Sequence, residues 1–468
     1  MFTRLVEKEL RHHLLDFRFQ AILVLCLALS LLSVVVGQRT YRRELQEYSA
    51  VRASNQGDLS MWMERGMFRQ FSSYGYRWNR PPEVLSPVVY GLSGVLGKEV
   101  RLHYEYVPEF EGSPLETDLL HAFLGSLDFA LIVRIVLSLC VLLITYDSVC
   151  GEKARGTLRL YASFPTSRAR IAGAKLVGTS LAVLVPAGLS FSVVVVAMVL
   201  SPDISLGGSD LGRLLVMVVV FALYLVVFAA FGLLASALTH RRTSAFLGLL
   251  MLWTFWQFIV PNVAVGIARN RIPQESPYRI DREVAQLRRE ADDEVREEVN
   301  RFFEANVPGP WETLSKVEQD RILAGASAVG SASSLKHDEP YQAALAEFRR
   351  DRHNRIRRQV ALAGILSAVS PVGSVTTVAM DLARTGFDSQ MQIEEALSLH
   401  QVYLARYVRE KQGQRKRPID DFVPFSFDAD EPLSAVLERN TLHLLSLALL
   451  AILGFAGAYV AILRYDVR

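Results

Sequence analysis

The residues of this sequence with the most chemical potential lie in a short basic segment between two long apolar runs, 123–147 and 172–200. The segment combines an acid, several bases, a glycine, a proline and hydroxyl side chains. That mixture suits contact with another protein better than catalysis, and a basic loop that merely sets membrane topology is the alternative. The candidate residues are Glu152, Arg155, Gly156, Thr157, Leu158, Pro165, Ser167 and Arg168.

The turn-forming residues give this segment a predictable local structure. Gly156 allows the chain to turn or another backbone to approach closely, and Thr157 is able to cap a helical turn that begins after it. Pro165 ends the loop, and Ser167 is placed to cap the N-terminus of the next helix. Because charge alone does not call for these residues at these places, we interpret the segment as more than a topology marker.

Glu152 and Arg155 are three residues apart, which allows an ion pair on one face of a helix. An exposed pair of this kind contributes only about 0.3–0.5 kcal/mol, so stabilising the loop is a weak reason for Glu152 to be there. We therefore expect Glu152 to contact a partner protein or a neighbouring element at the same face of the membrane.

Catalytic and metal sites find little support in the sequence. The apolar runs contain no Ser–Lys, Asp–Asp or His–Glu–His set, which argues against an intramembrane hydrolase. The nine histidines show no metal-ligand spacing within one helix. The three cysteines lie in or beside apolar runs, so they form no disulfide framework for the polar regions. We expect no catalytic residue, no cofactor-binding residue and no metal ligand in this chain.

Apolar runs of about 20 residues organise the whole chain, and they carry almost no charge, as a bilayer-spanning helix requires. The charged residues crowd into 38–122 and 268–440. Residues 1–18 are amphipathic and suit an interfacial helix. The predicted fold class is an all-α membrane protein with six spans and a mainly helical extracytoplasmic domain that includes a little β structure. The predicted spans are 19–37, 123–147, 171–200, 211–238, 244–268 and 441–464.

Short loops decide the expected orientation, because long loops cross the membrane regardless of their charge. Lysine and arginine crowd the 148–170 loop, and Arg241 and Arg242 fill the turn between spans four and five, whereas the turn between spans three and four carries only acids. Both termini are therefore expected in the cytoplasm, with 38–122 and 269–440 outside the inner membrane. The net charge of +3 is too mild to predict nucleic-acid binding.

The two regions outside the spans have different patterns. Apolar and polar residues alternate at 100–106, which predicts a strand. Region 269–440 is long enough for a domain of its own, and we expect its glycine-, alanine- and serine-rich stretch 324–334 to connect helices. Its apolar residues recur at helical spacing in three stretches, 284–302, 341–348 and 388–411.

Two charged residues belong to the second span. Arg134 is near its middle, where an unpaired cation costs several kcal/mol. Asp128 comes six residues earlier, about 240° around a helix, so the two do not share a face. Asp128 is also close enough to the outer boundary to be hydrated. We expect Arg134 to face another helix, another subunit or a polar cavity, and we keep both as candidate intramembrane functional residues.

The basic segment also has a recognisable order of residues, namely Glu152-x-x-x-Gly156-Thr157-Leu158, then Phe164-Pro165-x-Ser167-Arg168, then Lys175 at the base of span three. This order resembles the signature of ABC-2 type transporter permeases. Other stretches resemble the branch of this family that has a large external domain between spans five and six. They are Arg80-Pro81-Pro82, Gly91-Leu92-Ser93, Leu127-Asp128-Phe129, Ser370-Pro371 and Tyr465-Asp466-Val467-Arg468.

The resemblance implies a function. In that family the loop between spans two and three, here 148–170, carries a coupling helix that docks onto a separate ATPase chain, and that chain binds ATP and Mg²⁺. It implies the permease subunit of an ABC transporter, usually an exporter, paired with a second copy or a paralogue in the membrane lipid. An envelope or accessory protein is a further partner. The alternative function is a mechanotransmission or envelope-signalling subunit, driven by the same ATPase without moving a substrate.

Overall fold

The structure is a computed structural model. It describes residues 2–94, 97–104, 108, 110–111, 128–157, 167–273, 277–307, 309–412, 419, 421–427 and 431–464. Parts of the sequence motifs, Leu127, Leu158, Phe164-Pro165 and 465–468, lie outside these residues. The chain divides into two compact units, Met1–Asn262 with Gly364–Arg468 and Val263–Ala363.

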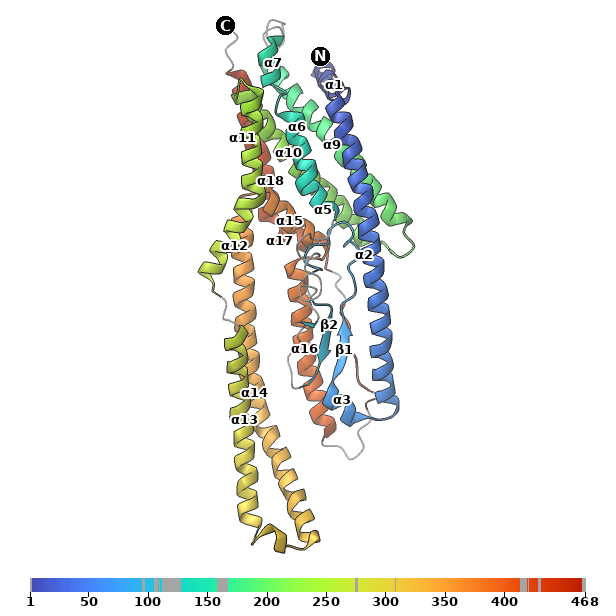
Figure 1. Cartoon of the computed structure of the whole chain (residues 1–468), viewed down its shortest axis with the longest axis vertical. Helices are drawn as coiled ribbons and strands as arrows, with labels where there is room; N and C mark the ends of the chain where they lie inside the picture. The colour runs from blue at the N-terminus through green and yellow to red at the C-terminus, as the bar shows by residue number, and fades with distance from the viewer. Residues whose placement is uncertain are drawn as a thin grey trace. The chain divides into compact units, whose positions relative to one another are not determined.

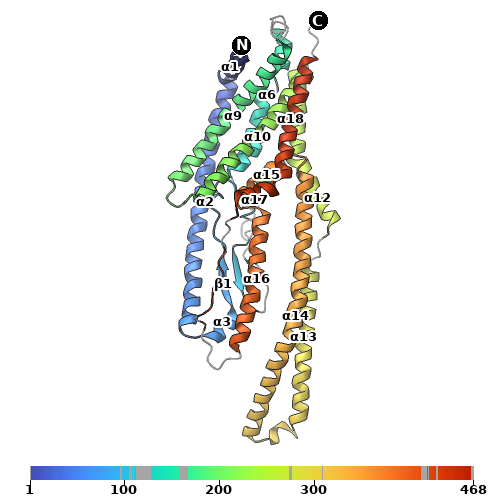
Figure 2. The same cartoon turned by 180° about the vertical axis from the view of Figure 1, so that it is seen from behind.

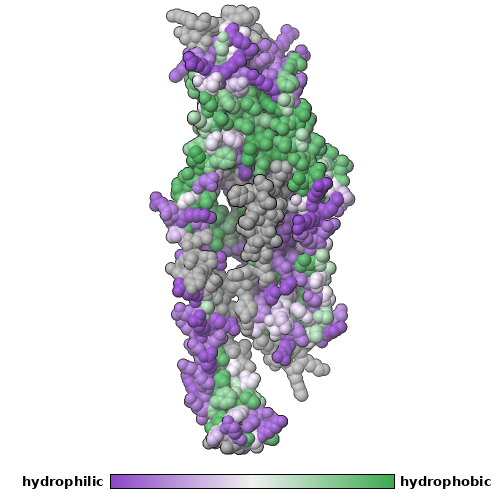
Figure 3. Space-filling view, viewed as in Figure 1, coloured by the Kyte–Doolittle hydropathy of each residue, from purple (hydrophilic) through white to green (hydrophobic). Residues whose placement is uncertain are grey.

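Within the described residues, six helical segments are long and apolar enough to cross a bilayer, which confirms the all-α membrane class. Two of them, the second and the fifth, contain a turn of π-helix. Apolar side chains form a belt over these helices (Figure 3). The spans are α2 (Phe17–Glu64); α5 (Phe129–Leu131), η2 (Ile132–Leu137) and α6 (Ser138–Thr145); α9 (Arg168–Leu200); α10 (Gly208–Leu238); α11 (Arg242–Thr254), η3 (Phe255–Ile259) and α12 (Val260–Arg271); and α18 (Thr441–Leu463).

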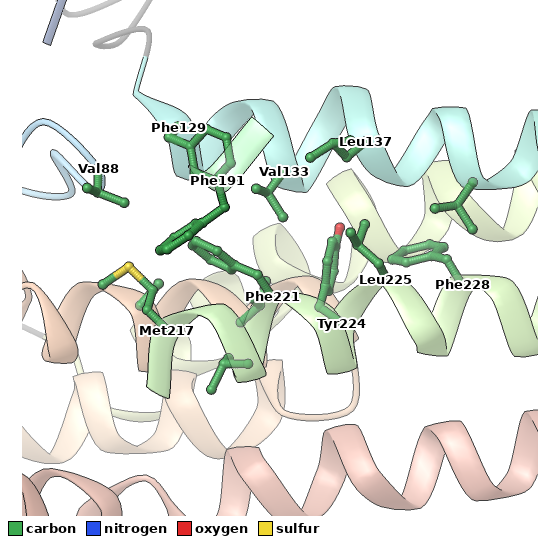
Figure 4. Packing of buried hydrophobic residues seen from close by; sticks show 14 of the residues in the cluster. Val88, Phe129, Val133, Leu137, Phe191, Met217, Phe221, Tyr224, Leu225 and Phe228 are labelled. Carbon is green, nitrogen blue, oxygen red and sulfur yellow. The ribbon is translucent and has the colours of Figure 1, made fainter. Parts of the chain in front are cut away.

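Helix α10 is the centre of the bundle, because it packs against α6, α9 and α18 (Figure 2). Its buried side chains face the start of span two, as Figure 4 shows. The Phe221 ring meets Phe129 of α5 and Phe191 of α9 edge-on, with centroids 6.1 and 6.5 Å apart. Because α10 buries side chains against three other spans, it positions the helices that pack around it.

A further apolar helix, α15 (Pro371–Leu382), packs against α10 and α18 but is too short to span a bilayer. The Ser370 hydroxyl caps it by accepting a hydrogen bond from Val372 N–H at 3.1 Å, and donates to the Trp256 carbonyl at 2.9 Å. Pro371 suits the first helical position, where no N–H partner is needed. Part of the 269–440 region thus shares the apolar core of the spans.

A small mixed domain forms one end of the bundle, which we call the sheet end (Figure 1). Its strands β1 (Tyr76–Asn79), β2 (Glu99–Leu102) and β3 (Phe110–Glu111) are antiparallel in the order β1-β2-β3. Strand β2 confirms the start of the strand predicted at 100–106, but it ends at Leu102, and 105–106 lie outside the described residues. The aromatic core of the sheet is shared with α3 (Phe68–Tyr74), α16 (Phe387–Gln412) and the end of α2.

The second unit is an antiparallel helix pair, α13 (Pro277–Asn306) and α14 (Lys316–Ser367), with the 3-10 turn η4 (Trp311–Thr313) between them. A Cβ on Gly325 would lie 2.5 Å from the Phe302 ring, so the two helices are in close contact there. Our expectation that 324–334 connects helices is wrong, because its small residues lie inside α14. Small side chains let α13 approach closely, which is why a loop-like composition occurs within a helix.

Candidate docking site on the short helix α7

A short helix, α7 (Cys150–Arg155), lies at the end of span two, within the basic segment 148–170. Gly156 ends the helix in the left-handed conformation, with φ of 73°, and its N–H donates to the Lys153 carbonyl at 3.2 Å. This is the turn that the sequence predicts for Gly156. Helix α7 lies at the same end of the bundle as α1 (Phe2–Leu14) and the last turns of α18, which we call the α7 end (Figure 1).

Polar contacts hold residues 149–153 on the end of α10. The Ser236 hydroxyl accepts hydrogen bonds from the backbone N–H groups of Val149 and Cys150, at 3.0 and 3.1 Å. The Lys153 ammonium donates to the Ala237 carbonyl in the last turn of α10. The final carbonyls of a helix have no partner within it, so a lysine there satisfies one of them and also meets the negative end of the helix dipole.

A buried charge cluster, formed by Glu9, Glu152 and Lys175, joins α7 to α1 and α9. The Lys175 ammonium donates to Glu152 Oε1 at 2.7 Å and lies 3.3 Å from both carboxylate oxygens of Glu9. The Lys175 side chain is 2% exposed, and those of Glu9 and Glu152 are 11% and 13% exposed. Removing such charges from water costs several kcal/mol per ion, so each depends on its partners. The Lys175 cluster therefore fixes where α7 lies.

Helix α1 packs on α9 through its polar residues. A Cβ on Gly178 of α9 would lie 2.7 Å from the Glu9 Cβ, so the helices cross closely at this glycine. The residues of α1 that the protein buries are Glu9 and His13, and His13 Nε2 is 3.4 Å from the Thr179 hydroxyl. Beyond α1, Phe17 remains 80% exposed. Within α1 the exposed side chains are mainly charged and the buried ones are Glu9 and His13, so an interfacial position of this helix remains a prediction.

Acidification should loosen α1. Burial lowers the pKa of His13 from 6.5 to about 4, so the unfolded or detached helix binds the proton more readily than the docked one. Stability is therefore complete above pH 6.5 and is lost as the pH falls towards 4, by about 2 kcal/mol at pH 5. A spin label at Arg4→Cys should become more mobile between pH 7 and pH 5. The same label beside His13→Asn should show no such pH dependence, and equal curves would contradict this assignment.

The C-terminal half of α7 presents an exposed surface. Ala154, Arg155, Gly156 and Thr157 are all exposed. The Arg155 Nε donates to the Gly151 carbonyl at 3.2 Å, so the pairing with Glu152 that the spacing allows is replaced by the bond from Lys175. One half of this helix is thus anchored in the bundle, and the other half faces outward.

The remaining residues of the predicted segment are only partly described. Ser167 caps α9 as predicted, because its side chain accepts a hydrogen bond from Arg170 N–H at 3.4 Å. Arg168 is the first residue of α9. Leu158 and Pro165 lie outside the described residues, so their predicted roles are not tested by the geometry.

Arg134 and Asp128 lie away from α7, near the sheet end. Arg134 is five residues after Phe129, the start of the span, so the prediction that it lies near the middle is wrong. The Asp128 carboxylate caps α5 by accepting a hydrogen bond from Leu131 N–H at 2.8 Å, and it also accepts one from Tyr90 N–H at 2.8 Å. It is therefore a structural cap rather than a merely hydrated boundary residue. Arg134 Nη1 donates to the Thr376 hydroxyl of α15 at 3.2 Å, so its side chain does face another helix. The two residues line one cavity.

Sequence reasoning missed Glu9 and Ser236 as parts of this site. Glu9 is one acid of an amphipathic stretch, and Ser236 is a small polar residue in an apolar run, so neither stands out by pattern. The signal that was available is Lys175, eight residues into the helix of span three. A lysine at such a position needs a partner within the protein, and an acid of the preceding interfacial helix is a natural source.

Two comparisons with known proteins bear on this arrangement. A family model described as ABC-2 family transporter protein matches residues 3–460, which is nearly the whole chain. A search of curated proteins finds no match.

Proposed function

Because the chain belongs to the ABC-2 family of transporter proteins, we propose that it is the permease subunit through which a separate ATPase moves a substrate across or out of the membrane. ATP and Mg²⁺ bind that ATPase chain. The permease works with a second copy of itself or a paralogue, in the branch of the family that has a large external domain. Export is the proposed direction.

The geometry of α7 is the observation that carries this proposal. A helix that transmits force must be rigid towards its own bundle and accessible to its partner. The Lys175 cluster and Ser236 supply the first property, and exposed residues 154–157 supply the second. In this proposal Glu152 is a positioning residue, and the contact with the ATPase is made by Arg155, Gly156 and Thr157.

The proposed location is the inner membrane, with the α7 end in the cytoplasm. Lys153 and Arg155 of α7 and Arg241 and Arg242 of the turn before α11 support this orientation, because positive residues in short loops favour the cytoplasmic side. An ATPase in the cytoplasm then reaches α7 directly. The α5 end of span two and α15 face the outside.

Reversing the charge of Arg155 should uncouple the ATPase. Because Arg155 is exposed and bonds only to a carbonyl of its own helix among the described residues, we expect Arg155→Glu to leave the thermal stability of the chain unchanged. We expect at least a tenfold loss in stimulation of the co-expressed ATPase, about 1.4 kcal/mol of coupling. The measurements are co-purification, ATP hydrolysis in nanodiscs and crosslinking from Thr157→Cys.

Arg241→Glu is the matched control, since it makes the same charge change at the same end but outside α7. Coupling should survive in that variant. A crosslink from Thr157→Cys to the ATPase also tests the orientation, because the ATPase is cytoplasmic. Normal coupling in Arg155→Glu, together with no crosslink, would sink the proposal.

The envelope-signalling alternative draws support from the second unit. Helices α13 and α14 form a long pair with mixed charges rather than a layered domain around a core. Such a pair suits contact with an envelope protein. Deleting 277–366 distinguishes the two functions. If the chain is a transporter, ATPase stimulation and substrate transport in proteoliposomes should survive the deletion. If it is a signalling subunit, the deletion should abolish signalling.

A further inference from the structure

A cavity of about 150 Å³ lies at the sheet end of the bundle, between the first turns of span two, α10 and α15. Much of its wall is apolar and includes Val133 and Phe221. In the described part of the chain, the polar side chains that line it are Asp128, Arg134 and Thr376. An arginine thus faces a cavity whose other polar side chains are one carboxylate and one hydroxyl.

Three spans hold the backbone of Arg134 in place. Arg134 lies in the π-helical turn η2. In such a turn the backbone carbonyls depart from the regular α-helical hydrogen-bond pattern. The Arg134 carbonyl accepts hydrogen bonds from Ser138 at 2.5 Å and from Tyr224 of α10 at 2.8 Å. Trp253 of α11 donates to the same Ser138 hydroxyl at 2.8 Å. The position of the arginine is therefore built into the bundle.

The charge of Arg134 is not matched by a carboxylate in direct contact among the described residues. A guanidinium has five N–H donors; Nη1 donates to Thr376, whereas Nε is buried and makes no hydrogen bond there. Both carboxylate oxygens of Asp128 already accept backbone N–H groups, from Leu131 and Tyr90. Asp128 lines the same cavity, but among the described residues it forms no ion pair with Arg134 and its oxygens are occupied, so the site retains a directed donor.

The size and depth of the cavity limit what fits there. A volume of about 150 Å³ admits one compact anionic group with the start of an apolar chain, and not a whole lipid or a polymer. Arg134 follows Asp128, which caps the start of the span, by about 9 Å of helix rise. An arginine at that depth reaches the boundary between head groups and hydrocarbon. The planar guanidinium of Arg134 presents paired N–H donors that match the geometry of phosphate and carboxylate.

From this geometry we propose that the Arg134 cavity binds the anionic head of an amphiphile, a phosphate or a carboxylate that carries an apolar tail. The guanidinium binds the anion, the Thr376 hydroxyl orients the guanidinium, and the apolar wall receives the first methylenes. That this amphiphile is the transported substrate class rests on the proposed function; the binding itself does not.

The test uses the purified full chain in a neutral maltoside detergent, with dodecyl phosphate as the probe. Native mass spectrometry should show one retained molecule per chain, and a thermal-shift titration should give a saturable stabilisation. We expect Arg134→Gln to weaken binding at least tenfold. Inorganic phosphate should bind at least tenfold more weakly than dodecyl phosphate, and equal binding of the two would overturn the amphiphile assignment.

A second variant, together with the stability measured without probe, separates an effect on binding from an effect on folding. Ala379→Leu narrows the cavity and keeps Arg134, so it should also weaken dodecyl phosphate binding at least tenfold. Without probe, Arg134→Gln should be as stable as the unmodified chain, because Arg134 forms no ion pair among the described residues and glutamine is also able to donate to Thr376. A marked loss of stability without probe, or an unchanged response to dodecyl phosphate, would show that Arg134 is a structural residue and end the proposal.

The substrate role is tested separately, in nanodiscs that contain the ATPase. Anionic phosphatidylglycerol should stimulate hydrolysis in the unmodified complex and fail to do so with Arg134→Gln, compared with phosphatidylcholine alone. Binding to the chain without any ATPase coupling would remove the proposed function and keep the anion site. Coupling through α7 without dodecyl phosphate binding would keep the proposed function and remove the anion site.

Discussion

Lys175→Met should lower the free energy of unfolding by about 3–5 kcal/mol, the cost expected when one member of a buried ion cluster is removed. The substitution leaves the carboxylates of Glu9 and Glu152 buried side by side without their cation. Helices α1 and α7 should then separate from α9, and stimulation of the partner ATPase should be lost with them. Unfolding by SDS in mixed micelles measures the stability, and hydrolysis in nanodiscs measures the coupling.

Neutralising the carboxylates should reverse most of that loss. In Glu9→Gln/Glu152→Gln/Lys175→Met no charge remains to be desolvated, and replacing a complete buried ion cluster is often close to neutral. Lys336→Met is the matched control, because the pair of Lys336 with Glu298 is exposed and contributes at most about 1 kcal/mol. If the single Lys175→Met variant were as stable as that control, the cluster would not be what holds α7.

Much of the fold could be predicted because membrane spans are local features. A run of about 20 apolar residues that crosses the lipid forms a helix, because its backbone N–H and C=O groups must bond to one another there. The apolar runs of the sequence therefore lie within α2, α9, α10 and α18, each a single helix. The short strand β2 is indicated by its alternation. Helix α15 shows the limit of this reasoning, since the 12 residues that begin at Pro371 are too few to indicate a span.

The charge contacts of the site could not be predicted, because periodicity identifies the face of a helix and not its partner. Glu9 and Lys175 are 166 residues apart. Only the approach of α1 at Gly178 brings them together. The same holds for Arg134 and Thr376, which are 242 residues apart. The exposed tip of α7 was more predictable, since Gly156 requires a turn wherever the helix ends.

Gly454→Leu is expected to separate α18 from α10 and cost about 3 kcal/mol or more. A Cβ on Gly454 would lie 2.8 Å from the Ala230 Cβ and 3.2 Å from the Ala230 carbonyl carbon. Neither atom belongs to a flexible side chain, so the helix backbones themselves would have to move. Small residues four apart on one face, here Gly454 and Ala458, are what permits such an approach between membrane helices. Overpacking elsewhere costs about 1–3 kcal/mol.

Gly188→Leu gives the matched control, because nothing lies within 4 Å of a Cβ at that exposed position of α9. It should be neutral or slightly stabilising, since leucine favours a helix over glycine by up to about 1 kcal/mol. Ala230→Gly in the Gly454→Leu background returns part of the missing space, so the two changes should be less than additive in SDS unfolding. Additive losses would mean that the clash is relieved elsewhere. Because α10 also carries Ser236 and Tyr224, a displaced α18 should disturb α7 and the Arg134 cavity only if α10 moves with it.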